Sequence, residues 1–72
     1  MKRIFESENG YVWHLLTESE ARRVIDSGIF KVHALNDDGE EIEITDSSQI
    51  ESHIRRGEYI GIGVGFYNDI EN

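Results

Sequence analysis

The chain has 72 residues, contains no cysteine, and carries a net charge of −8 from 15 acidic and 7 basic side chains. This length allows one domain, and a domain of this size buries only about 60% of the surface that its unfolded chain exposes. The lack of cysteine excludes disulfides and thiolate metal sites. The acidic charge disfavours direct binding to nucleic acid and to anionic membranes, and it favours basic partners.

The composition also bears on location. No apolar run approaches the roughly 20 residues that a membrane-spanning helix needs. Glu6 follows Ile4 and Phe5 too early for this segment to be a signal peptide. Together with the lack of cysteine, these features predict a cytoplasmic protein that does not associate with membranes.

Apolar and β-branched residues predict five strands, arranged as two hairpins and one final strand. Asn9-Gly10 and Asp38-Gly39 mark the two hairpin turns, because these residues tolerate a positive φ. In the final strand, large apolar residues alternate with positions that are mostly glycine. The expected strands are residues 2–7, 11–16, 29–35, 40–45 and 59–66.

Two helices are expected, one after each hairpin, over residues 17–27 and 46–56. Each begins with a capping-box pattern, in which two side chains three residues apart satisfy free backbone N–H groups. Each ends at a glycine, which adopts the left-handed conformation at little cost. The apolar residues of each helix form one stripe that must pack on the sheet. The capping pairs are Thr17 with Glu20 and Asp46 with Gln49, and the glycines are Gly28 and Gly57.

The two halves of the chain have similar spacing when the sequence is shifted by 29 residues. The shift aligns the hairpin turn, the apolar strand face, the helix cap and the final glycine of one half with those of the other. In particular, Trp13 and Leu15 fall on Ile42 and Ile44. Few aligned residues are identical, so either a tandem strand–strand–helix repeat or chance spacing of two ordinary units explains the match.

The predicted fold is therefore α+β: a two-layer sandwich of order β-β-α-β-β-α-β, with two helices on one face of a mainly antiparallel, roughly five-stranded sheet. We expect residues 1–66 to form the domain and residues 67–72 to be a polar tail that frays. Strand order stays open, with hairpin partners as neighbours and helices as crossover connections. Because a small domain needs its large side chains inside, the residues expected in the core include Tyr11, Trp13, Phe30, Tyr59 and Phe66.

The glycines of the last strand, Gly61, Gly63 and Gly65, are a candidate binding surface. Their spacing does not match a phosphate-binding loop, which needs a strand-to-helix turn. Glycine on one face of a strand instead permits a close approach. The group that approaches is either Tyr11 or Trp13 of a neighbouring strand, a partner subunit, or a flat ligand.

Residues 37–51 are rich in carboxylates and contain no lysine or arginine. The stretch does not match a calcium-binding EF-hand loop. It is interpreted either as a solvated outer face or as a docking surface for a basic protein. The candidate partner-binding residues are Asp37, Asp38, Glu40, Glu41 and Glu43.

No motif predicts catalysis, a cofactor or a metal. The chain has no cysteine nucleophile and no G-x-S-x-G pattern. His14, His33 and His53 are scattered without metal-ligand spacing, and we expect them to be structural.

Three functional hypotheses follow, in order of preference. The first is a non-enzymatic protein-interaction module, in one version a homodimer formed through the sheet. The second is an acidic inhibitor that mimics nucleic-acid charge and blocks a basic nucleic-acid-binding protein. The third is a binder of a small ligand or of divalent cations.

Overall fold

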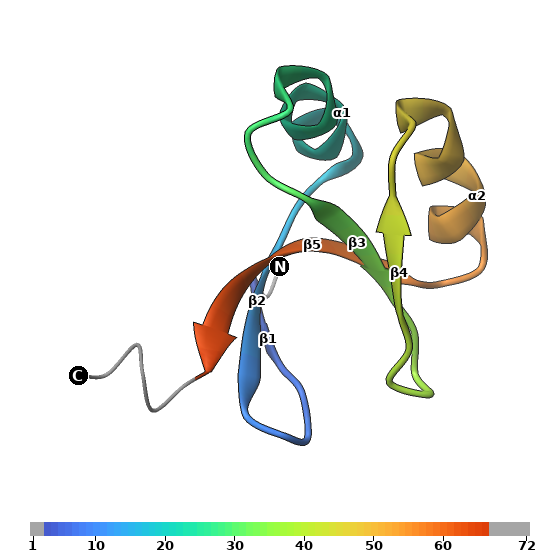
Figure 1. Cartoon of the computed structure of the whole chain (residues 1–72). Coiled ribbons are helices and arrows are strands. Elements are labelled where there is room, and N and C mark those ends of the chain that lie inside the picture. The colour runs from blue at the N-terminus through green and yellow to red at the C-terminus, as the bar shows by residue number, and fades with distance from the viewer. Residues whose placement is uncertain (1–2, 67–72) are drawn as a thin grey trace.

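The computed structural model describes residues 3–66, which form one five-stranded antiparallel sheet and two α-helices (Figure 1). The element order β-β-α-β-β-α-β is the one that the sequence predicts, and so is the α+β class. The tail expected over residues 67–72 lies outside the described residues. The elements are β1 (Ile4–Glu6), β2 (Tyr11–Leu15), α1 (Glu18–Ser27), β3 (Val32–Leu35), β4 (Glu41–Ile44), the 3-10 helix η1 (Ser47–Gln49), α2 (Ile50–Arg55) and β5 (Tyr59–Phe66).

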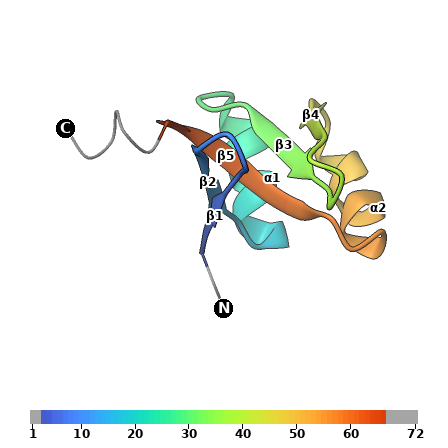
Figure 2. The ribbon, with the colours of Figure 1, turned by 90° about the horizontal axis from the view of Figure 1, so that it is seen from below.

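The last strand occupies the centre of the sheet. The spatial order is β1-β2-β5-β3-β4, so β5 lies between the two hairpins. Each hairpin pairs internally and each helix belongs to a crossover connection, as predicted; the structure adds that each connection passes one intervening strand. Both helices lie on one side of the sheet, at the top of Figure 1. The turns of the two hairpins lie next to each other at the bottom of the same view. Seen from below, β5 runs diagonally between the hairpins (Figure 2).

Both predicted capping boxes are confirmed. At the start of α1, Glu20 N donates to Thr17 Oγ1 at 3.2 Å, and Thr17 N donates to Glu20 Oε1 at 2.9 Å. At the second cap, Asp46 N donates to Gln49 Oε1 at 3.3 Å. The turn after Asp46 is the 3-10 helix η1, so α2 is shorter than the sequence predicts.

The main core lies between the helices and the sheet. Ala21 of α1 and Ile50 of α2 are fully buried there. They pack on apolar strand residues that face the helices. These are Val32, Ala34, Ile44 and Ile60.

The opposite face of the sheet carries a second, smaller core. Trp13 and Leu35 come from strands on either side of β5, yet each is only 3% exposed. Gly63 pairs with Trp13 and Gly61 with Leu15, so β5 presents no side chain on this face at these two positions. Large side chains of the two hairpins therefore meet across β5, and the ring centroids of Trp13 and His33 lie 5.2 Å apart. The sheet curls around this cluster.

The expected strand over residues 29–35 begins only at Val32. Ile29 and Phe30 lie in the connection after α1 and are 74% and 58% exposed, so Phe30 is not a core residue. The chain needs these residues to pass from the end of α1 to the sheet. Tyr59 and Phe66, which were also expected in the core, are exposed as well. They lie at the two ends of β5, where the helices and hairpins no longer cover the strand.

The two halves of the chain are not equivalent on their second strands. Leu15 lies on the face of Trp13, whereas Ile44, with which the 29-residue shift aligns it, lies on the helix face. The caps and terminating glycines do correspond, with φ of 69° at Gly28 and 82° at Gly57. The tandem repeat therefore stays a hypothesis.

Close backbone contact at the glycine strand gives a first prediction. A Cβ at Gly61 would lie 2.9 Å from the backbone carbonyl oxygen of His14, which the sheet holds in place. At Gly63 the nearest atom would be the Tyr11 hydroxyl oxygen, at the end of a side chain that can rotate. We expect Gly61→Ala to lower the free energy of unfolding by about 1–3 kcal/mol and Gly63→Ala to cost less. Urea unfolding followed by circular dichroism measures both, and equal losses would contradict this account.

The first helix cap gives a second prediction. Arg3 donates to both oxygens of Glu20, at 2.9 and 2.8 Å, and this bond, helped by the Thr17 backbone, lowers the pKa of Glu20 from 4.5 to about 2. The charged carboxylate therefore stabilises the fold above pH 4.5, and this contribution disappears as the pH falls towards 2. Glu20→Gln should lose stability at neutral pH, and its deficit against the native chain should shrink as the pH falls.

Urea midpoints across an acid pH series measure this effect. Arg3→Gln is the matched variant and should weaken the same pH dependence. A Glu20→Gln deficit that is constant with pH would show that the ion pair does not cause it.

Candidate functional site

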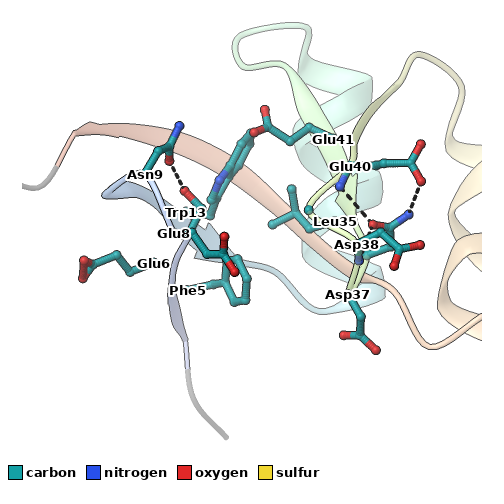
Figure 3. Close-up of a pocket in the computed structure, with 13 residues that line it drawn as sticks. Phe5, Glu6, Glu8, Asn9, Trp13, Leu35, Asp37, Asp38, Glu40 and Glu41 are labelled. Atoms are coloured by element: carbon teal, nitrogen blue, oxygen red, sulfur yellow. Dashed lines mark hydrogen bonds between the residues drawn. The ribbon is translucent and has the colours of Figure 1, made fainter.

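A groove of about 480 Å³ lies between the two hairpins, on the side of the sheet away from the helices (Figure 3). Residues 5–9 of the first hairpin form one wall, and residues 35–41 of the second form the other, with Trp13 between them. We call this hollow the acidic groove. It exists because the sheet curls at β5 and brings the ends of both hairpins to one side.

The floor of the acidic groove is apolar. Phe5 of β1 is opposite Trp13 of β2 in the ladder, and Leu35 approaches Trp13 from β3 (Figure 3). Trp13 and Leu35 are buried, whereas Phe5 is half-buried and has its ring centroid 5.9 Å from that of Tyr59. Phe5 is therefore the floor residue that has apolar surface open to a ligand.

The rim of the acidic groove is lined by carboxylates from both hairpins. No lysine, arginine or histidine of the described chain is among the lining residues. Like charges gathered at a concave surface raise the local concentration of cations and of basic ligands. The six carboxylates are Glu6, Glu8, Asp37, Asp38, Glu40 and Glu41, and all are exposed.

Side-chain hydrogen bonds fix the second hairpin turn. Asn36 Oδ1 accepts from Asp38 N at 3.0 Å and from Glu40 N at 2.9 Å. Asn36 Nδ2 donates to Glu40 Oε1 at 3.1 Å, which orients that carboxylate. Such bonds from an asparagine to nearby backbone groups replace the water that a free turn would bind. This wall of the groove is therefore preorganised.

The first hairpin turn is fixed in a similar way. Ser7 Oγ donates to Asn9 Oδ1, and Asn9 Oδ1 also accepts from Tyr11 N at 3.2 Å. Gly10 N donates to the Ser7 carbonyl at 2.9 Å, as Gly39 N does to Asn36 at 3.1 Å in the second hairpin. The two walls thus have turns of the same construction.

The ion pairs of residues 3–66 lie away from the acidic groove. Arg22 lies 4.0 Å from Glu18, and Arg55 lies 2.6 Å from Glu51, each within one helix. The Arg3–Glu20 pair joins the start of β1 to α1. The paired arginines thus lie on the helix side, and no basic side chain of residues 3–66 lines the groove.

Most of the acidic residues singled out in the sequence meet at this groove. Asp37, Asp38, Glu40 and Glu41 line it, whereas Glu43 is exposed further along β4, opposite His33. Glu6 and Glu8 were missed by the sequence analysis. Both precede the Asn9-Gly10 turn, but only the strand order shows that this turn lies beside the other hairpin.

The glycine strand is occupied by the chain itself. Tyr11 lies over Gly63, and its ring centroid is 5.2 Å from that of Phe66. Gly61 lies against the backbone of His14, and Gly65, with φ of 141°, lies next to a bulge in the β2–β5 ladder. None of the three glycines lines the acidic groove. The close approach expected at these positions is therefore intramolecular at Gly61 and Gly63.

The histidines lie apart from one another. His14 is on the helix face and His33 on the groove face, while Nδ1 of His53 lies 2.7 Å from Glu58 Oε1 in a buried pair. Within residues 3–66, no group of three or more histidine, aspartate or glutamate side chains is placed to hold a metal ion.

No helix in the described part of the chain combines the length and apolar character needed to cross a membrane. Comparison with known proteins adds no relative. No protein-family model matches the chain. Searches of curated proteins and of solved structures return no match either. The acidic groove is therefore interpreted from its own chemistry.

Proposed function

We propose that this chain is a small, non-enzymatic protein-interaction module that binds a basic segment of a partner protein in the acidic groove. One observation carries the proposal: carboxylates of both hairpins meet around an apolar floor, and no basic side chain of residues 3–66 lines the groove. Charge and shape together favour a ligand with positive ends and aliphatic stems.

Lysine and arginine have that chemistry. Their aliphatic stems pack on apolar surface while the charged ends remain in contact with water or carboxylates. In the acidic groove the stems would lie on Phe5, and the charged ends would reach the rim. The negative field of the rim would also speed the encounter with a basic partner.

The proposal is one of binding rather than catalysis, because all six rim carboxylates are exposed. A carboxylate that acts in acid–base catalysis usually needs an enclosed environment. A second copy of the chain is also a poor ligand, since it would bring another set of carboxylates. The glycine face that a homodimer could use is occupied by Tyr11 at Gly63.

Neutralising the rim tests the proposal. We expect the triple variant Glu8→Gln, Asp38→Asn, Glu41→Gln to bind the peptide acetyl-Lys-Leu-Arg-Lys-Leu-Arg-amide about tenfold more weakly than the native chain in low salt. Isothermal titration calorimetry measures this affinity, and rising salt should weaken the native complex.

The control has the same net charge but an intact groove. It carries Glu18→Gln, Asp26→Asn and Glu51→Gln on the helices, and it should keep most of the native affinity. Equal losses in the two triple variants would show that net charge, and not the groove, governs binding.

A second candidate function is inhibition of a nucleic-acid-binding protein. It is favoured by the rows of carboxylates on two walls, which can occupy a site built for phosphates. Proteins captured on the immobilised chain in low salt should then be released by an excess of duplex DNA or RNA. Captured proteins that remain bound under those conditions would exclude this second function.

A further inference from the structure

We infer that the basic partner segment adds to the sheet as an extra strand along the outer edge of β4, next to the acidic groove. This inference rests on the proposed function and specifies the conformation of the bound segment. It is carried by the free backbone edge of β4, by the alternation of its side chains and by its continuity with the groove.

Within residues 3–66, the backbone of β4 is free on its outer side. β4 is the last strand in the spatial order, so no strand of residues 3–66 pairs with that side. Hydrogen-bonded and non-hydrogen-bonded pairs alternate along an antiparallel ladder. Asn36 N donates to the Glu40 carbonyl at 3.3 Å, which makes this a bonded pair. Counting along the β3–β4 register, the backbone N–H and C=O groups of Glu41 and Glu43 point outward.

The side chains of β4 alternate in character. Glu41 and Glu43 pair with Leu35 and His33 on the groove face. Ile42 points to the helix face and is 40% exposed. A strand added beside β4 would place every second residue next to a carboxylate and the intervening residue next to Ile42. The edge is therefore complementary to a segment in which basic and apolar residues alternate.

Edge and groove form a continuous surface, because Glu41 belongs to both. A segment that pairs with β4 can thus extend past the second hairpin turn and reach the rim. Backbone hydrogen bonds would supply sequence-independent affinity, and the alternating side chains would supply selectivity, as in other cases of strand addition to a sheet edge.

Glu41 and Glu43 also determine which kind of strand can pair with the edge of β4. Two copies of β4 paired edge to edge would bring glutamates close together, and like charges in neighbouring strands are destabilising. A basic strand gains from the same charges. Repulsion of one partner and attraction of another together produce specificity. The edge thus favours a basic strand over a second copy.

Hydrogen exchange of single amides tests the added strand. The probe is the peptide acetyl-Lys-Val-Lys-Val-Lys-Val-Lys-amide, and the control peptide has the same composition with its four lysines first and its three valines last. With the alternating peptide bound, the amides of Glu41 and Glu43 should exchange at least about tenfold more slowly, because they become hydrogen-bonded. The Ile42 amide, which already bonds to β3, should change less. The control peptide should protect neither glutamate amide.

A proline variant tests the edge by a separate route. Glu43→Pro removes one outward N–H group and leaves the β3–β4 bonds, and proline is tolerated at such edge positions. Glu43→Gln is the matched control, because it loses the same charge but keeps the N–H group. We expect Glu43→Pro to bind the alternating peptide several-fold more weakly than Glu43→Gln does, with circular dichroism confirming that both are folded.

The outcomes separate the two proposals. Equal binding of both peptides, without protection of Glu41 and Glu43, would overturn strand addition and leave the acidic groove as the binding site. If neither peptide binds in low salt, the proposed function itself fails, and strand addition fails with it. Protection of the two amides by the alternating peptide alone would support both.

Discussion

The rest of the structure depends on the absence of side chains at Gly61 and Gly63 on one face of the central strand. This absence lets Trp13 and Leu35 meet across β5, although they belong to different hairpins. The contact curls the sheet and gives a 72-residue chain a second small core on the face that the helices leave uncovered. Burial of large apolar groups on both faces of the sheet is important for stability, because a domain this small buries only a limited fraction of its surface.

The curl also determines where the charges meet. Glu6 and Glu8 are about thirty residues from Asp37 and Asp38 in the sequence, yet they line the same groove because both hairpins extend to one side of the sheet. Arg3, Arg22 and Arg55 form salt bridges on the helix side. The segregation of charge is thus a consequence of topology as much as of composition, and it leaves the groove rim lined by carboxylates of both hairpins.

Local signals in the sequence were sufficient for the elements and their order. The capping boxes at Thr17 and Asp46 and the turns at Gly10 and Gly39 depend on neighbouring residues alone, and each is confirmed. The central place of β5 depends on long-range pairing, which periodicity does not encode. For the same reason the sequence pointed to Asp37 and Glu41 but not to Glu6 and Glu8. The core position predicted for Phe30 is wrong, because the connection after α1 leaves this side chain exposed.

Trp13 is the single tryptophan of the chain, and its position makes it an internal optical probe. Its indole ring forms part of the groove floor and also of the contact that joins the hairpins. Indole emission shifts in wavelength when the polarity around the ring changes. An occupant of the groove and a separation of the hairpins would alter that polarity in different ways, so the unlabelled protein can report on ligand entry and on opening of the curl.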